Sequence, residues 1–211
     1  MNLINTIFIC IMTCMFSSPE CQNEATLQWE AQNTMIHAGC RNNVDIEDTI
    51  VFIGDSRTVG MQMNCPDGLY ICKCGEGYRW LVSEETSQSV DQAVRSSDIF
   101  VFNLGVNDLH NVHLYADYIR EFTEKYPGAM VAYMSVNPID DQKAEEHGYR
   151  VTDEQVVAFN EKLRELLPQD VLWIDTHDFL MEGGYETSDG IHYTAETYED
   201  IYSYTINQIT Q

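Results

Sequence analysis

A serine, an aspartate and a histidine in this chain have the types and spacing needed for nucleophilic catalysis. Ser56 ends the segment Gly54-Asp55-Ser56, and Asp189 precedes His192 by three positions near the other end of the chain. In a catalytic triad the histidine takes the proton of the serine hydroxyl, while the carboxylate fixes the tautomer and orientation of the imidazole. The sequence therefore predicts Ser56 as nucleophile, His192 as general base and Asp189 as its orienting partner.

Two further segments could stabilise the negative charge that such an attack creates. Asn107 lies in Gly105-Val106-Asn107-Asp108, where its side-chain amide could point at the developing oxyanion. The backbone amide of Gly75 or Gly77, together with that of Ser56, would complete the oxyanion hole. Gly77 is favoured because it lies nearer the start of a predicted helix. Each of these segments, taken alone, is also typical of a turn or a helix cap.

Four side chains beside these segments are candidates for binding or support. Arg57 would contact an anionic or polar acyl substrate or would pair with an acidic neighbour, and the pairing is favoured. Tyr78 and Trp80 could form a platform for a sugar or an acyl group, although aromatic residues near strand ends more often belong to the core. Asp108 is expected to accept hydrogen bonds from backbone amides under its loop.

Other motifs point to weaker alternatives. Asp175 and His177 form a second Asp-x-His pair, which is ranked below the first because it lies before a further loop. His110 and His113 could share one face of a helix, but no third ligand with suitable spacing accompanies them, so no metal site is predicted. The six-residue dinucleotide fingerprint is absent, which argues against a nicotinamide site. The predicted chemistry needs neither a metal nor an organic cofactor.

The elements that would position these residues alternate between strand and helix. Short apolar runs predict buried strands, and segments of helical character lie between them. The strands are expected at 50–53, 69–72, 99–104, 130–136 and 171–174, and the helices at 87–96, 112–126, 153–167 and 195–209. This alternation predicts βαβ units and a mostly parallel sheet covered by helices on both faces. The candidate residues would then gather at the carboxyl edge of the sheet.

Length and charge restrict the organisation and the partners of the chain. Its 211 residues predict one globular domain, which we place at 49–211, after a hydrophobic leader or signal peptide at 1–20 and a polar linker at 21–48. The leader predicts a secreted or cell-surface protein. With 34 acidic and 11 basic residues the formal net charge is −23. Such a charge repels phosphate backbones and anionic lipids, so we expect no nucleic-acid partner and no membrane insertion beyond the leader.

Five cysteines remain after the predicted leader, at positions 21, 40, 65, 72 and 74. Export permits disulfides, and Cys65 and Cys72 could close a small loop around the turn between them. Cys72 and Cys74 lack the second Cys/His pair that a zinc site requires. Buried or disulfide-paired thiols are the favoured interpretation.

Taken together, the segments resemble those of the SGNH hydrolases, the superfamily of GDSL-type esterases and lipases. That family contributes a serine in Gly-Asp-Ser, a glycine, an asparagine in Gly-x-Asn-Asp and a late Asp-x-x-His, and the same order runs here over roughly residues 50–205. The resemblance implies a flavodoxin-like three-layer α/β/α sandwich with a five-stranded parallel sheet. It also implies the three triad roles given above, with Gly77 or Gly75 and Asn107 as oxyanion donors. Arg57 departs from the family name, which has leucine at that position.

The function expected from these residues is that of a serine esterase with an acyl-enzyme intermediate on Ser56. The predicted substrate is a short acyl ester, such as an O-acetyl group on a carbohydrate, presented by a small molecule or a glycan. A lipid-directed esterase, lysophospholipase or thioesterase, and an acyltransferase acting on glycans, would use the same machinery. A non-catalytic binding module of the same fold would be marked by a lost triad member, and none is lost.

Overall fold

The computed structural model describes residues 50–95 and 97–211, and these contain one five-stranded sheet. All neighbouring strands are parallel, in the order β2-β1-β3-β4-β5. The strands are β1 (Ile50–Gly54), β2 (Leu69–Cys72), β3 (Ile99–Asn103), β4 (Met130–Met134) and β5 (Leu172–Ile174). The five expected strands are confirmed, although β4 ends at Met134 rather than at position 136. The predicted leader and linker, with Cys21 and Cys40, lie outside the described residues.

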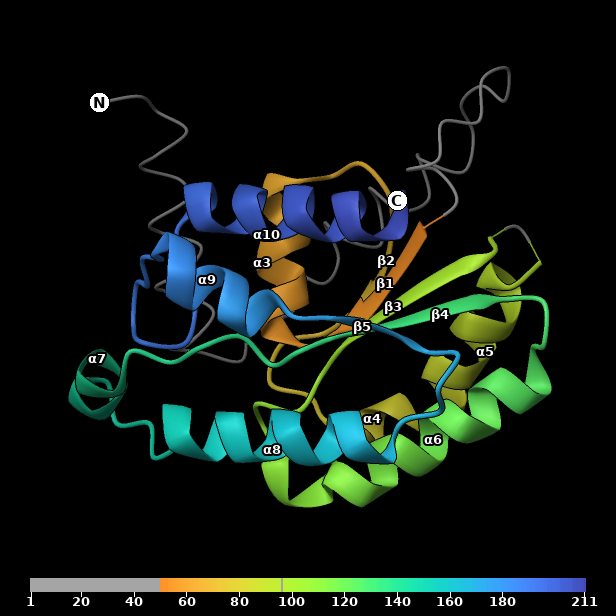
Figure 1. Ribbon diagram of the computed structural model, residues 1–211, viewed down its shortest axis with the longest axis horizontal. Coiled ribbons are helices and arrows are strands. Elements are labelled where there is room, and N and C mark those ends of the chain that lie inside the picture. Colours follow the sequence, from red (N-terminus) through yellow and green to blue (C-terminus); the bar gives the residue numbers. More distant parts are fainter. Residues whose placement is uncertain (1–49, 96) are drawn as a thin grey trace. The chain divides into compact units, whose positions relative to one another are not determined.

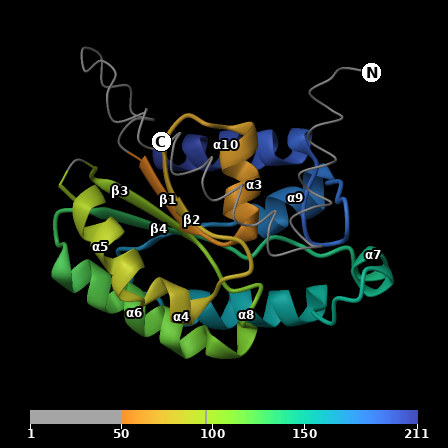
Figure 2. The ribbon, with the colours of Figure 1, turned by 180° about the vertical axis from the view of Figure 1, so that it is seen from behind.

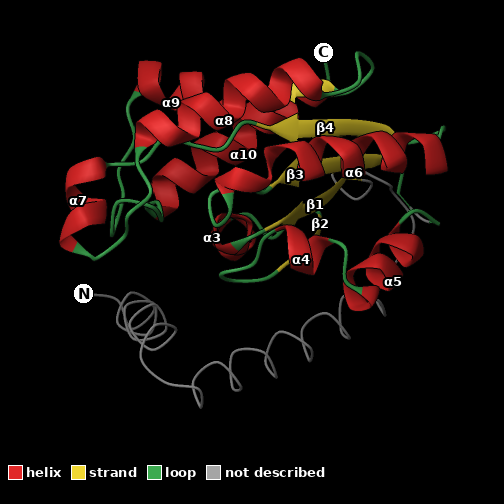
Figure 3. Ribbon diagram, turned by 90° about the horizontal axis from the view of Figure 1, so that it is seen from below, coloured by secondary structure: helices red, strands yellow, loops and turns green. Residues whose placement is uncertain are grey.

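Helices cover both faces of this sheet (Figures 1 and 2). One face carries α3 (Ser56–Asn64), α9 (Thr176–Gly183) and α10 (Ala195–Ile209), and the other carries α4 (Tyr78–Leu81), α5 (Glu84–Ala93), α6 (Val112–Lys125) and α8 (Asp153–Leu166). The short helices η2 (Leu109–Asn111) and α7 (Asp141–Glu146) lie in connections. Figure 3 separates the strands, in yellow, from the flanking helices, in red. The predicted three-layer α/β/α sandwich is confirmed. None of the described helices is long and apolar enough to span a bilayer.

Strand side chains alternate between two hydrophobic cores, one on each face of the sheet. In β1, Val51 and Ile53 pack with residues of α5, α6 and α8, whereas Ile50 and Phe52 pack with residues of α3 and α10. All four side chains are at most 1% exposed. Because both faces of each central strand are covered, the strand sequences are continuously apolar rather than alternating.

The helices differ from the sequence prediction in their bounds and in their number. Helix α5 begins at Glu84, before the predicted start at position 87, because the Ser83 hydroxyl accepts a hydrogen bond from the Thr86 amide and caps the helix. Helices α3, α4, α7 and α9 are not among the four helices expected from the sequence. They are short, and α7 buries only Ala144, so it has no apolar periodicity to detect. Helix α8 begins with a capping box, in which the side chains of Thr152 and Gln155 each accept a hydrogen bond from the other residue's backbone amide.

The strand order creates a natural place for a site between β1 and β3. These strands are neighbours, but the chain leaves β1 into α3 on one face and leaves β3 into η2 and α6 on the other. The two connections therefore diverge at the carboxyl edge, as at the ligand sites of other open α/β sheets with this strand order. Ser56 follows β1 and Asn107 follows β3, so both predicted segments belong to this edge.

Candidate active site

Three side chains from distant parts of the chain meet at the carboxyl edge of the sheet. His192 Nε2 lies 2.9 Å from Ser56 Oγ, and His192 Nδ1 lies 2.7 Å from Asp189 Oδ2. This geometry lets Nδ1–H donate to the carboxylate while Nε2 accepts the hydroxyl proton of the serine. Ser56 is partly exposed, whereas His192 is 6% exposed. The three residues that the sequence selected are therefore brought together in the geometry that their predicted roles require.

Ser56 is placed by a tight turn at the end of β1. A Cβ on Gly54 would lie 1.8 Å from Thr58 Oγ1, so only glycine fits where the strand ends. Asp55 then caps α3 by accepting a hydrogen bond from the Arg57 amide at 3.0 Å. Ser56 is consequently the first residue of α3, and among the described residues its amide has no backbone or side-chain acceptor. The amide and the helix dipole both favour negative charge at this point.

Asp189 is held as an ionised carboxylate. Its Oδ1 accepts hydrogen bonds from the backbone amides of Ile191 and His192, at 3.0 and 2.8 Å, across a turn in which Gly190 has a φ of 93°. Burial opposes the charge, but the bonds from the His192 ring and from the two amides outweigh it and hold the pKa of Asp189 well below its usual range. An ionised acceptor is the form that orients the histidine.

Tyr149 is a fourth residue at the triad. Its hydroxyl donates to Asp189 Oδ2 at 3.2 Å, from the connection between α7 and α8. No motif in the sequence marks this tyrosine, because it lies 40 positions from its partner. Only the folded arrangement of the two segments reveals the contact.

Asn107 is tied to the glycine loop that follows β2. Its side-chain Nδ2 donates to the backbone carbonyl of Glu76 at 2.7 Å. A primary amide has two N–H donors, so this bond fixes the orientation of the amide and uses one of them. The neighbouring Gly77 amide has no acceptor among the described residues. The structure thus joins two of the predicted oxyanion segments directly.

The two candidate glycines differ in what surrounds them. Gly77 has an ordinary extended φ of −145°, but a Cβ there would lie 2.5 Å from Asp108 Oδ2. Gly75 has a φ of 72°, and nothing lies within 4 Å of where its Cβ would be. Gly77 is therefore needed for a close approach, and Gly75 for the turn itself. Because Gly77 packs closely against Asp108, it contacts the loop that carries Asn107.

Asp108 supports these loops rather than facing a substrate. Its Oδ2 accepts from the Tyr78 amide at 2.9 Å and from Asn111 Nδ2 at 2.8 Å, and its Oδ1 accepts from the Tyr115 hydroxyl at 2.5 Å. The predicted structural role of Asp108 is confirmed. The carboxylate connects the start of α4 with the start of α6.

Arg57 occupies a different environment from the one predicted. It is 1% exposed, and its guanidinium donates to the carbonyls of Ile191 and Asn137 at 3.1 and 2.8 Å, while it lies 5.4 Å from the centroid of the Tyr193 ring. It forms no salt bridge with any residue that the structure describes. Its burial argues against the predicted substrate contact. The predicted acidic neighbour is Asp55, whose pKa burial raises and the charge of Arg57 acts to lower, although no salt bridge joins the two side chains. Nε and Nη1 of the buried guanidinium donate to these two carbonyls, whereas Nη2 is buried without a hydrogen-bond acceptor among the described residues.

The aromatic platform is also not formed as predicted. Trp80 is 8% exposed and belongs to the core beneath α4, which agrees with the alternative of a core residue. Tyr78 is partly buried and packs edge-on against Tyr115, with ring centroids 5.7 Å apart. Trp80 therefore has no surface to offer a sugar or an acyl group.

Asp175 and His177, the second Asp/His pair, make other contacts in the structure. Asp175 caps α9 and accepts from Trp173 Nε1 at 3.2 Å, while His177 Nε2 lies 3.1 Å from Asp153 Oδ1. Neither residue contacts Ser56. Within the described part of the chain no cluster of three metal-binding side chains exists.

Cys65, Cys72 and Cys74 are free thiols, so the loop-closing pair considered from the sequence is not formed. Burial is the largest influence on the thiol pKa of Cys65 and Cys72 and raises both, that of Cys65 to about 11. The favoured interpretation of buried thiols holds for Cys65 and Cys72, whereas Cys74 is exposed.

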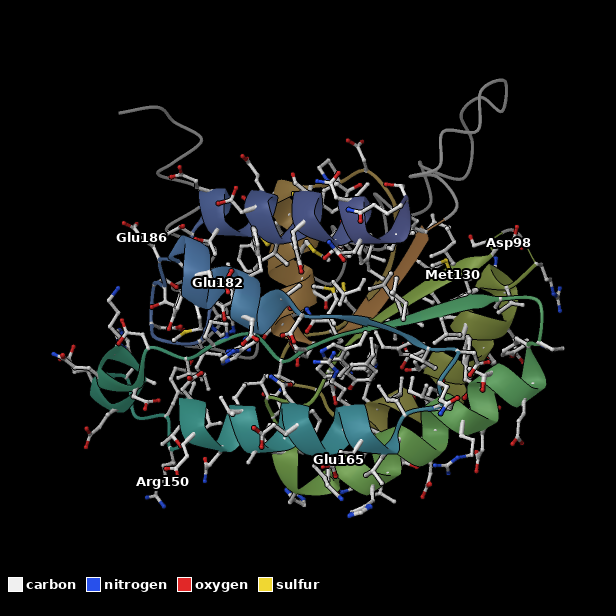
Figure 4. All side chains as sticks on the ribbon, in the orientation of Figure 1. Asp98, Met130, Arg150, Glu165, Glu182 and Glu186 are labelled. Carbon is white, nitrogen blue, oxygen red and sulfur yellow. The ribbon has the colours of Figure 1, made fainter. Side chains whose placement is uncertain are left out.

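A cleft of about 630 Å³ opens beside the loop that carries Asn107. It lies between η2 and α8 and has both apolar and basic walls, formed among others by Phe159, Val151, Arg150 and Lys162. Figure 4 shows Arg150 projecting outward from the connection that precedes α8. A group bound in this cleft would touch the residue predicted to stabilise an oxyanion.

Comparison with known proteins identifies the fold. No family model and no curated protein matches the sequence. A Streptococcus pneumoniae structure, provisionally called a platelet activating factor, is 18% identical with a TM-score of 0.63, over 90% of this chain and 99% of the other.

Two enzymes with the same architecture are more distant. A lipase/acylhydrolase from Enterococcus faecalis is 14% identical with a TM-score of 0.56, over 76% of this chain and 94% of the other. The acetylxylan esterase of Geobacillus stearothermophilus is 15% identical with a TM-score of 0.53, over 76% and 93%. At these identities the likeness establishes the fold, which is the one that the resemblance to SGNH hydrolases implied.

Proposed function

We propose that this chain is an SGNH-type serine hydrolase that cleaves ester bonds through an acyl-enzyme on Ser56. The observation that carries the proposal is the unbroken hydrogen-bonded series from Ser56 through His192 to Asp189, with contacts of 2.9 and 2.7 Å. An arrangement of hydroxyl, imidazole and ionised carboxylate in this order is the machinery of acyl transfer on several unrelated folds.

In the first half of the reaction, Ser56 Oγ bonds to the carbonyl carbon of the ester while its proton passes to His192 Nε2. The carbonyl oxygen becomes an oxyanion, for which the free amides of Ser56 and Gly77 and the remaining N–H of Asn107 are the donors. The tetrahedral intermediate collapses as the bond to the leaving oxygen breaks, and His192 returns the proton to that oxygen. The alcohol departs and the acyl group stays on Ser56.

In the second half, water repeats these steps. His192 Nε2 accepts a proton from the attacking water, the oxyanion forms again at the same donors, and the bond to Ser56 Oγ breaks. The proton on His192 then returns to the serine and the carboxylic acid is released. An acceptor hydroxyl in place of water would make the reaction a transfer instead of a hydrolysis.

The proposed substrate is a short acyl ester, such as an O-acetyl group on a carbohydrate. The cleft beside Asn107 supports a polar group next to the site, because its walls include Arg150, Lys162 and Gln155, although neither Ser56 nor His192 lines it. Structures of similar fold include the acetylxylan esterase described above and a peptidoglycan O-acetyltransferase from Streptococcus pneumoniae, 18% identical with a TM-score of 0.53 over 79% of this chain and 96% of the other. We also propose export, on the basis of the apolar leader at 1–20.

Labelling with a fluorophosphonate probe tests the enzymatic proposal. We expect the folded wild-type protein and a Ser89→Ala control, which alters an exposed serine on α5, to be labelled, and Ser56→Ala to remain unlabelled. Labelling of Ser56→Ala at the wild-type rate, or no labelling of the wild type, would exclude Ser56 as an activated nucleophile.

A series of p-nitrophenyl esters of increasing acyl length tests the substrate. The expected result is the highest kcat/KM with acetate, as the proposed short acyl substrate requires. A clear preference for octanoate or longer chains would favour a lipid-directed enzyme over a carbohydrate esterase.

A further inference from the structure

The carboxylate of Asp189 has a complete set of hydrogen-bond donors. A carboxylate offers about four lone-pair sites. Backbone amides of Ile191 and His192 occupy Oδ1, the His192 ring occupies Oδ2, and Tyr149 supplies the fourth donor at 3.2 Å. The Asp189 side chain is 13% exposed, so little of it is left for water. Tyr149 is the only one of the four donors that comes from outside the turn at 189–192.

The Tyr149 hydroxyl is suited to donate rather than to accept. Burial, followed by the charge of Asp189, raises the pKa of Tyr149 to about 12. The hydroxyl therefore keeps its proton, and the ionised carboxylate is its acceptor. Its position is fixed by its own backbone, since the Tyr149 amide donates to the Ala144 carbonyl at 2.9 Å.

The segment that carries Tyr149 is bonded to the residues in and beside the turn at 189–192 at several further points. The Asp140 amide donates to the Gly190 carbonyl at 3.0 Å, and Lys143 Nζ donates to the Thr187 carbonyl at 2.9 Å. The Gly190 backbone packs on Ala144 so closely that a Cβ on Gly190 would lie 2.2 Å from the Ala144 amide nitrogen. The connection through α7 thus forms a rigid support against which the turn at 189–192 is held.

We propose that Tyr149 is a positioning residue of this site, whose hydroxyl holds Asp189 Oδ2 in line with His192 Nδ1. The proposal rests on the proposed function, because its effect is on the triad. Tyr149 acts through Asp189 and contacts none of the reacting atoms.

Tyr149→Phe removes the hydroxyl and keeps the ring. We expect kcat to fall by about 3- to 10-fold, the range for loss of one hydrogen bond, while KM stays within about 2-fold because the substrate does not touch the hydroxyl. The matched control is Tyr126→Phe, which removes a hydroxyl bonded to the Asp91 carboxylate on α5 at the surface. The control is expected to keep the wild-type kcat.

Two readouts separate positioning from a general loss of structure. The proton shared by His192 Nδ1 and Asp189 gives a far-downfield resonance in the proton NMR spectrum, which Tyr149→Phe should shift and Tyr126→Phe should leave in place. In a double-mutant cycle, Tyr149→Phe should have no further effect on kcat in an Asp189→Asn background, because the ionised acceptor is gone.

Different results would contradict the positioning role of Tyr149 and the proposed esterase function. An unshifted resonance with an unchanged kcat in Tyr149→Phe would overturn the positioning role while the activity of the wild type remained. An equal fall in kcat on Tyr149→Phe in the wild-type and the Asp189→Asn backgrounds would overturn the positioning role as well. A wild type that neither hydrolyses esters nor reacts with the fluorophosphonate would overturn the proposed function itself, and the positioning role with it.

Discussion

Substitution of Gly77 by alanine tests the coupling between the glycine loop and the loop that carries Asn107. The φ of −145° at Gly77 is negative, so the substitution does not place alanine in the left-handed region. The new Cβ would, however, lie 2.5 to 2.7 Å from the carboxylate atoms of Asp108. Normal contact requires the carboxylate to move by about 1 Å.

The carboxylate of Asp108 cannot move freely, because Tyr78, Asn111 and Tyr115 all donate to it. Breaking one such charged hydrogen bond costs about 1.5–3 kcal/mol, which is the expected loss in the free energy of unfolding. Since Asp108 is adjacent to Asn107, the same movement displaces the oxyanion donor. A displacement of about 1 Å can lower the rate about 10²-fold, and we expect kcat/KM to fall by about that factor.

Gly75→Ala is the matched control in the same loop. Its Cβ would meet nothing within 4 Å, but its φ of 72° places alanine in the left-handed region. We expect a loss of about 1–2 kcal/mol in stability, comparable with that of Gly77→Ala, and a kcat/KM within about 3-fold of wild type. Urea denaturation and p-nitrophenyl acetate hydrolysis measure the two quantities. A Gly75→Ala variant as inactive as Gly77→Ala, or a fully active Gly77→Ala, would refute the assignment of the close contact to Gly77.

Two further predictions concern single residues. Asn107→Ala should lower kcat by about 10²- to 10³-fold with the fold intact, as expected for one lost oxyanion donor, and a fall of less than about 3-fold would exclude that role. Burial raises the pKa of Asp55 from 3.8 to about 6, against the opposing effects of Arg57 and His192, so the folded state binds a proton that the unfolded state has lost between these pH values. Stability therefore falls as pH rises through this window, and Asp55→Asn, which still caps α3, should be more stable than wild type by up to about 3 kcal/mol at pH 8 in urea. This advantage should disappear below about pH 4, and an advantage that grows on acidification would contradict the direction of the shift.

The parts of this fold that could be predicted from sequence are those with a local signature. Strands such as 50–54 are buried on both faces and therefore continuously apolar, and the turn at 189–192 brings its aspartate and histidine together within four residues. The environment of Arg57 has no local signature, because its acceptors lie 80 and 134 positions away. Neither Tyr149 nor the close approach of Gly77 to Asp108 follows from spacing. These contacts depend on how separate loops meet at the carboxyl edge.

Arg57 explains how Ser56 and His192, the proposed nucleophile and base, are held together although they belong to distant segments of the chain. It follows Ser56 directly, and its guanidinium binds the Ile191 carbonyl on the turn of the base and the Asn137 carbonyl on the connection after β4. A leucine, which the family name has at this position, could contact these segments but could not bind their carbonyls. The connection after β4 is in turn bonded to the triad turn through the Tyr193 hydroxyl, which donates to the Pro138 carbonyl at 2.5 Å.

The turn at 189–192 lies outside the sheet, and these bonds fix it relative to the start of α3, where Ser56 lies. A triad requires its members to be held within about 0.5 Å of the productive geometry. The departure from leucine at Arg57 is therefore consistent with an intact site, since the arginine joins its two halves by hydrogen bonds in place of an apolar contact.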